Sequence, residues 1–139
     1  MPAPRDIILG IDQGTTNTKV VAIDGEGRVL AQAARGIATM AAEPGFGEQD
    51  ANGMVANILA CITELLERLG LRPAAIMALG IANQTETLVV WDARTGRPQM
   101  PAIVWQCRRG GEELNALRSP DAVADLRPTS RRVTMQGEG

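Results

Sequence analysis

The sequence predicts an α/β fold in which an antiparallel meander of three strands precedes an amphipathic helix, further strands and a hairpin. Three observations support this prediction. Apolar runs begin at Ile7, Val20 and Val29 and are joined by short polar turns. Apolar residues then recur at helical spacing from Met54 onward. A further apolar run over residues 76–81 predicts another strand.

The first expected strand, residues 7–11, is a nearly continuous apolar run that ends at Asp12, as in a strand covered on both faces. The second covers residues 20–23. The stretch DGEGR at 24–28 follows, and Asp-Gly between apolar runs is a strong hairpin signal. The third strand is expected over 29–39. Such short connections exclude a Rossmann fingerprint, in which glycines open a helix directly after the first strand.

A loop and a long helix are expected next. Residues 43–50, EPGFGEQD, have the composition of a loop, and Asp50 can cap the helix that follows. Gly70 supplies the stop of that helix. The apolar stripe, which we expect to face a sheet, comprises Met54, Val55, Ile58, Leu59, Ile62, Leu65, Leu66 and Leu69.

The strand at 76–81 runs into ANQTET, after which TLVVWD, the turn ARTG and PAIVWQ predict a hairpin. A last helix is expected over 111–118. Residues 119–139 lack a clear periodicity. We therefore expect a partial domain over 1–118 and a divergent, disordered or truncated tail over 119–139.

Composition excludes several classes of protein. The net charge of −2 argues against binding to nucleic-acid backbones, and the three aromatic residues, Phe46, Trp91 and Trp105, are too few for base stacking. The chain has no histidine and no CxxC, so Cys61 and Cys107 indicate neither a zinc site nor a disulfide framework. Cys61 is expected to be inert core. No apolar run approaches the length of a membrane span, and the cytoplasm is the expected compartment.

The stretch LGIDQGTTNTK, residues 9–19, takes a strand that ends in a carboxylate into a turn of glycine, hydroxyls and a lysine. Asp12 can hold Mg²⁺, Gly14 permits close approach, and Lys19, the chain's single lysine, can neutralise phosphate charge. The side chains that can donate to phosphate oxygens are Thr15, Thr16, Asn17 and Thr18. The alternative is hairpin chemistry alone, with Asp12 satisfied by backbone N–H groups. A Walker A loop is absent.

Four co-linear segments, GIDQGTTNTK, PGFGEQD, GIANQTETLVVWDARTGRP and PAIVWQCRR, resemble the N-terminal part of the FGGY carbohydrate kinases, most closely the glycerol kinase branch. The resemblance covers residues 7 to about 118. It implies a ribonuclease H-like, actin-like ATPase fold, with two such domains closing over ATP and a sugar or polyol. The implied reaction transfers the γ-phosphoryl group of ATP to a substrate hydroxyl.

Carried over residue by residue, the resemblance implies that Asp12 is the Mg²⁺-linked carboxylate. It also implies that the phosphates of ATP are bound by Gly14, Thr15, Thr16, Asn17 and Lys19. Glycerol kinases usually have arginine at the position of Lys19. A lysine keeps the charge but loses the planar fork that binds phosphate through two hydrogen bonds.

The residues that the resemblance assigns to the substrate are Gln84, Thr85, Glu86 and Trp105. In glycerol kinases an arginine and a glutamate hold the substrate hydroxyls, and here the pair is Thr85 and Glu86. Thr85 has one hydroxyl in place of five N–H donors. Another sugar or polyol is therefore about as good a candidate as glycerol. As alternatives, Trp105 could belong to the core and Gln84 could satisfy only backbone groups at the strand end.

No residue of this chain matches the catalytic aspartate of the family, and the domain that binds adenine and ribose is not represented. We therefore expect a truncated or frameshifted gene product that is inactive alone. One alternative is a non-catalytic remnant or interaction module, whose exposed sheet edge would form homo-oligomers. Another is a ribonuclease H-like nuclease, which needs several carboxylates around two metal ions; Asp12, Asp24 and Glu86 are the candidates, but no basic groove accompanies them.

Overall fold

The computed structural model describes residues 6–111 and residue 115. The chain divides into two compact units, Met1–Cys107 and Arg108–Gly139. The first contains every strand described below and the long helix. In the second, the N–H of Gly111 donates to the carbonyl oxygen of Arg108 (3.2 Å). Most of the helix expected over 111–118, and all of the tail over 119–139, lie outside the described residues.

The expected meander is present. Strands β1, β2 and β3 pair in antiparallel fashion, and β5 joins the other edge of β1 in parallel, which gives the order β3-β2-β1-β5. β3 was expected to reach residue 39 but ends at Gly36, because Gly36 pairs with Asn17, the first residue of β2. The four strands of this sheet are β1 (Ile7–Gln13), β2 (Asn17–Ile23), β3 (Val29–Gly36) and β5 (Ile76–Asn83).

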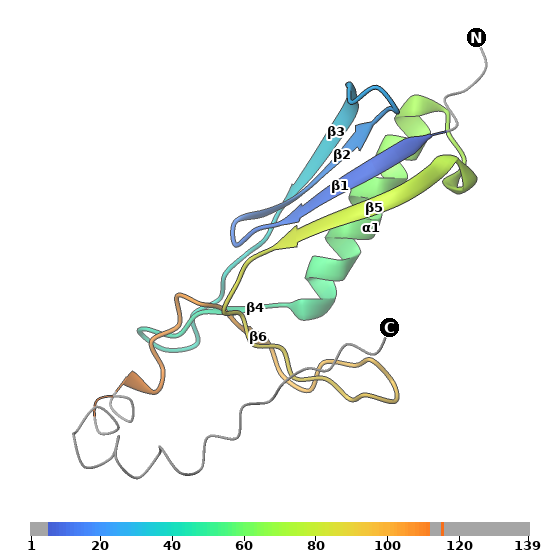
Figure 1. Cartoon of the computed structure of the whole chain (residues 1–139). Coiled ribbons are helices and arrows are strands. Elements are labelled where there is room, and N and C mark those ends of the chain that lie inside the picture. Colours follow the sequence, from blue (N-terminus) through green and yellow to red (C-terminus); the bar gives the residue numbers. More distant parts are fainter. Residues whose placement is uncertain (1–5, 112–114, 116–139) are drawn as a thin grey trace, which may run out of the picture. The chain divides into compact units, whose positions relative to one another are not determined.

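The expected helix, α1 (Ala51–Leu69), lies across one face of this sheet (Figure 1). Both of its predicted ends are confirmed. The carboxylate of Asp50 accepts a hydrogen bond from the backbone N–H of Asn52 (2.9 Å). At the other end Gly70 adopts the left-handed conformation, with φ of 62°, which glycine reaches without steric cost.

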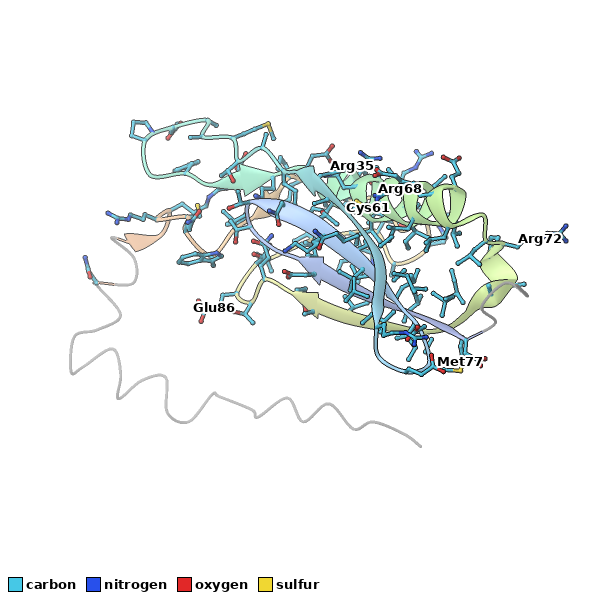
Figure 2. All side chains as sticks on the ribbon, turned by 90° about the horizontal axis from the view of Figure 1, so that it is seen from above. Arg35, Cys61, Arg68, Arg72, Met77 and Glu86 are labelled. Atoms are coloured by element: carbon cyan, nitrogen blue, oxygen red, sulfur yellow. The ribbon has the colours of Figure 1, made fainter. Side chains whose placement is uncertain are left out.

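The core lies between α1 and the inner face of β1, β2 and β3. Its buried side chains are Ile7, Leu9, Ile11, Val20, Ala22, Ala33, Cys61 and Leu65. Cys61 is fully buried, and burial raises the pKa of its thiol, so this cysteine is core as predicted. On the β3 side of α1, Arg35 forms an ion pair with Glu64 (3.1 Å) and Arg68 donates to the carbonyl oxygen of Gln32 (2.9 Å); Figure 2 shows both arginines.

The expectation that β1 is covered on both faces is wrong for the described residues. Ile8 and Gly10 are half-buried and Asp12 is exposed, because α1 covers a single face. Coverage also stops short of β5. The register aligns Leu79 with Leu9 and Ile81 with Ile11, which places them on the same face as α1. They are nevertheless 56% and 66% exposed, because α1 packs on β2 and β3.

The expected hairpin after β5 forms as a series of isolated bridges. The backbone N–H and carbonyl groups of Leu88 and Ile103 bond to each other in both directions (2.9 Å each). The turn is closed by the carboxylate of Asp92, which accepts from the backbone N–H of Thr95 (2.7 Å). The short strand β6 (Ala102–Ile103) pairs with β4 (Glu48–Gln49), and a 3-10 turn, η1 (Pro73–Ala75), precedes β5.

Candidate functional site

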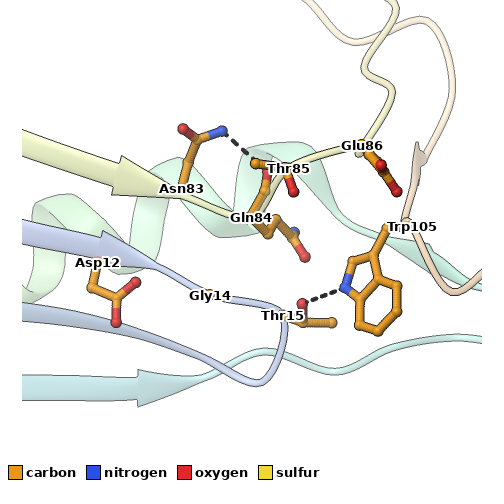
Figure 3. Close-up of a pocket in the computed structure, with 8 residues that line it drawn as sticks. All are labelled: Asp12, Gly14, Thr15, Asn83, Gln84, Thr85, Glu86 and Trp105. Atoms are coloured by element: carbon orange, nitrogen blue, oxygen red, sulfur yellow. Dashed lines mark hydrogen bonds between the residues drawn. The ribbon is translucent and has the colours of Figure 1, made fainter.

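A pocket of about 520 Å³ opens where the parallel strands β1 and β5 end side by side. The carboxyl ends of adjacent parallel strands are the usual place for ligands in α/β sheets. Figure 3 shows the side chains that surround it. The pocket is lined by Asp12, Gly14, Thr15, Asn83, Gln84, Thr85, Glu86 and Trp105. The sequence predicts all of these site residues except Asn83.

The turn between β1 and β2 is closed by backbone groups. The N–H of Gly14 donates to the carbonyl oxygen of Asn17 (3.0 Å). A Cβ on Gly14 would lie 3.3 Å from that same oxygen, so a larger residue would crowd the turn. The Thr15 hydroxyl accepts a hydrogen bond from the indole N–H of Trp105 (2.9 Å), which joins the turn to the opposite wall of the pocket.

Thr18 does not contribute a hydroxyl to the pocket, contrary to the expectation for this turn. Its side chain is fully buried, and its hydroxyl donates to the side-chain oxygen of Gln13 (2.8 Å). The reason is strand alternation: Thr18 lies in β2 and points to the same face as Val20 and Ala22.

Asp12 is exposed at the end of β1, and its carboxylate accepts no hydrogen bond from any described residue. The hairpin alternative, in which backbone N–H groups satisfy this carboxylate, is therefore not what the described residues show. Lys19 is the register partner of Asp12, so both side chains lie on the sheet face that α1 leaves open. Lys19 does not line the main pocket. Asp12 and Lys19 instead line an adjoining hollow of about 460 Å³ on that face.

Thr16 and Asn17, the other two residues assigned to phosphate, are exposed at the tip of the turn and do not line either hollow. The Thr16 carbonyl oxygen accepts from the backbone N–H of Ile37 (2.9 Å), which ties the tip to the chain that leaves β3. Their side chains are therefore available to solvent or to a ligand above the turn.

The loop after β5 supplies the other wall of the pocket. Glu86 is exposed and, among the described residues, is the one non-glycine with a positive φ, 58°. A residue of this kind costs free energy in the left-handed region, and such strain is concentrated at functional sites. Trp105 is 53% exposed, so the alternative that it belongs to the core is wrong.

Gln84 bridges the loop to a neighbouring element. Its side-chain N–H donates to the side-chain oxygen of Gln49 (3.0 Å), so its partners are not backbone groups alone. Its own side-chain oxygen is buried and has no partner among the described residues. A buried acceptor without a donor is costly, and a ligand or a water can satisfy it.

Three residues at the site were missed by sequence reasoning. Asn83 lines the pocket at the end of β5. Gln13 and Gln49 lie behind the pocket as buried polar side chains. A signal existed for Gln13, because a glutamine directly after Asp12 in a buried strand needs a polar partner. Gln49 stood in a segment expected to be loop.

The residues present fit a magnesium nucleotide better than a cluster of protein-bound metals. Among the described residues, no three acidic, cysteine or histidine side chains come together. Mg²⁺ is commonly held by one or two carboxylates together with phosphate oxygens, and a single exposed Asp12 matches that donor set. Asp12 and Glu86 line the same pocket, but Asp24, the third carboxylate named for a nuclease, lies beyond the far end of β2, where it binds Arg28 (2.7 Å).

Comparison with known proteins identifies the family. Residues 7–138 match the model of the FGGY family of carbohydrate kinases, N-terminal domain. A glycerol kinase of Pseudomonas putida (strain GB-1) is 39% identical over 130 residues, which are 94% of this chain and 26% of the relative. A glycerol kinase of Thermus brockianus is 46% identical over 111 residues, 80% of this chain and 22% of the relative.

Solved structures agree with this assignment. The crystal structure of Plasmodium falciparum glycerol kinase with ADP is similar with a TM-score of 0.76 and 28% identity, covering 88% of this chain and 25% of that one. A ligand-bound xylulose kinase from Lactobacillus acidophilus shares the fold, with a TM-score of 0.76 at 20% identity and coverage of 88% and 24%. The chain spans about a quarter of the length of the relatives it matches. It belongs to the FGGY family of carbohydrate kinases, as a match to the N-terminal domain of that family.

Proposed function

We propose that this chain is the N-terminal part of a kinase that transfers the γ-phosphoryl group of MgATP to a hydroxyl of a sugar or polyol. The observation that carries the proposal is the pocket of about 520 Å³ at the ends of β1 and β5. One wall holds Asp12, Gly14 and Thr15, and the other holds the loop after β5 together with Trp105. A phosphate-binding turn thus faces a substrate-binding wall across one space.

On the phosphate side, Asp12 would hold Mg²⁺, which supplies charge neutralisation on the phosphates when it is bound. Gly14 leaves room for a phosphate oxygen to approach the backbone. The exposed side chains of Thr16 and Asn17 can donate hydrogen bonds from the tip of the turn, and Lys19 adds a positive charge beside Asp12.

On the substrate side, the Glu86 carboxylate can accept hydrogen bonds from substrate hydroxyls, and the indole of Trp105 offers an apolar wall to a carbon skeleton. Gln84 and Thr85 add an amide and a single hydroxyl. These groups suit a ligand with several hydroxyls, which includes glycerol but does not select it over other polyols and sugars.

The chain alone is proposed to be inactive. Phosphoryl transfer depends on positioning and charge stabilisation from both sides of a closed cleft, and one side alone supplies little of either. A coupled assay of the purified chain with MgATP, glycerol and a polyol panel should show no turnover.

The described residues contain no helix long and apolar enough to cross a membrane. We propose a cytoplasmic location, with neither nucleic acid nor membrane as partner.

A chimaera tests whether the pocket is competent. Residues 7–107 of this chain would replace the matching segment of the Thermus brockianus glycerol kinase. The proposal expects phosphorylation of glycerol or of another member of a sugar and polyol panel. Asp12→Ala in the chimaera should lower kcat by about 10²-fold or more, the cost of losing one positioned electrostatic group. Glu67→Ala, an exposed acidic residue of α1 outside the pocket, should leave kcat unchanged. A folded chimaera that phosphorylates nothing would contradict the proposal.

A second candidate is a non-catalytic module that associates through β5. The observation in its favour is the exposure of Met77, Leu79 and Ile81, which are 56–66% exposed on a strand whose outer edge has no partner among the described residues. Such an uncharged edge is prone to pair with another chain. Size-exclusion chromatography with light scattering decides, since a stable monomer at high concentration would rule this candidate out.

A further inference from the structure

Gln49 is a fully buried polar side chain that none of the roles above uses. Its amide nitrogen donates to the carbonyl oxygen of Thr15 (2.6 Å) and to the hydroxyl of Thr39 (2.9 Å). Its amide oxygen accepts from the side chain of Gln84 (3.0 Å). Both N–H donors and the acceptor are therefore occupied, and a buried amide in this state has one favourable orientation.

The partners of Gln49 belong to opposite walls of the pocket. Thr15 is part of the turn between β1 and β2, and Gln84 opens the loop after β5. A second connection runs between the same two segments, because the backbone N–H of Gln84 donates to the carbonyl oxygen of Gln13 (2.8 Å). The side chain of Gln49 thus closes a ring of hydrogen bonds behind the pocket.

The backbone of Gln49 reaches the third segment. Gln49 pairs with Ala102 of β6, and Trp105 follows three residues later. The neighbouring Gly47 accepts from the backbone N–H of Val104 (3.1 Å). The indole of Trp105 then returns to the Thr15 hydroxyl (2.9 Å). Gln49 is therefore connected to all three segments that form the pocket. Its side chain bonds to the turn after β1 and to the loop after β5, and its backbone pairs with β6, which leads to Trp105.

We infer that Gln49 is a positioning residue that holds the phosphate-binding turn and the substrate-binding wall at a fixed separation. The inference rests on the proposed function, because a fixed separation affects catalysis only if a phosphoryl group must meet a substrate hydroxyl in this pocket. Gln49 itself contacts neither the pocket space nor any group that would react.

The test uses the isolated chain, with Trp105 as the reporter. Gln49→Met keeps the length of the side chain and removes every hydrogen bond that it makes. We expect exchange of the Trp105 indole N–H with solvent to speed up by about tenfold, the factor that corresponds to one hydrogen bond of typical net strength. The backbone N–H of Leu65, in the core, reports global unfolding. If both rates rise in equal proportion, Gln49 is merely structural and the inference is overturned.

A second variant, Gln49→Glu, gives a pH-dependent signal that a general loss of stability would not produce. In Gln49→Glu, a protonated carboxyl can still donate to the Thr15 carbonyl oxygen, whereas an ionised one repels it. Burial raises the pKa of a carboxyl, so the Trp105 indole resonance should shift with pH above the ordinary range of glutamate. The wild type and Gln32→Glu, a matched change at an exposed position of β3, should show no such shift. This titration decides the question if Gln49→Met does not fold, and a flat profile would overturn the inference.

Failure of this inference and failure of the proposed function are distinguishable. The Trp105 measurements need neither nucleotide nor sugar, so they report whether Gln49 sets the geometry of the pocket. The chimaera assay reports whether that pocket supports phosphoryl transfer.

Discussion

Two regions on the same face of the sheet, the strands under α1 and the edge strand β5, differ in how deeply their apolar side chains are buried. Under α1, Leu9 and Leu65 are almost fully buried, whereas Leu79 and Ile81 on β5 are more than half exposed although they share the same face. The pocket opens between these two regions, at the ends of β1 and β5. The difference indicates that β1, β2, β3 and α1 supply the stability of the described fold, while β5 and its loop supply half of the site.

The largest expected difference in unfolding free energy comes from replacing a leucine by alanine once in the core and once on β5. Leu65→Ala removes a fully buried side chain from the core and should cost about 2–5 kcal/mol of unfolding free energy. Leu79→Ala is the matched control on β5 and should cost less than about 1 kcal/mol, since half of that side chain is already in water. Urea denaturation measures both. Equal losses would show that β5 is packed as tightly as the core.

A smaller loss of stability is expected at the start of α1, in the well-packed region. Asp50→Ala removes the acceptor for the backbone N–H of Asn52 and should cost about 1 kcal/mol, the usual value of an N-cap. Asp50→Asn should restore most of this loss, because asparagine caps helices about as well as aspartate. Thermal denaturation of the three proteins checks the order. An unaffected Asp50→Ala would mean that packing alone sets the start of the helix.

Acid should weaken the turn between β2 and β3. Hydrogen bonds, first from the backbone N–H of Arg28, hold the pKa of Asp24 below its ordinary value of 3.8. The ionised carboxylate therefore stabilises the fold above pH 3.8, and this contribution is lost as the pH falls through the lower folded-state pKa. Asp24→Asn should be less stable than wild type near neutral pH, with the gap narrowing below 3.8. Glu26→Gln, at the exposed second partner of Arg28, is the control; a gap independent of pH would refute this account.

Local signals were sufficient for most of the fold. The Asp-Gly turn, the Asp50 cap and the Gly70 stop each act within a few residues, so the sequence pattern identifies them. The inward direction of Thr18 was also accessible, because strict alternation with Val20 and Ala22 assigns it to the buried face. The hydroxyl-rich composition of the turn obscured that alternation.

Contacts between distant segments were not accessible from one sequence. Gln49 and Thr15 are 34 residues apart, and nothing local to either predicts their hydrogen bond. The exposure of β5 could not be predicted for the same reason, since it depends on where a distant element, α1, packs. An apolar run predicts a strand, but its periodicity does not tell which neighbouring element covers it.

If the turn after β1 binds a ligand, the carboxylate of Asp12 serves that ligand and not the hairpin. Because the Asp12 carboxylate is exposed and accepts no hydrogen bond from the described residues, Asp12→Ala should change the unfolding free energy by less than about 0.5 kcal/mol, as surface changes usually do. The measurement is urea denaturation of wild type and Asp12→Ala under identical conditions. A loss of about 2 kcal/mol, the scale of stranded buried donors, would show that Asp12 serves the hairpin and would contradict the account.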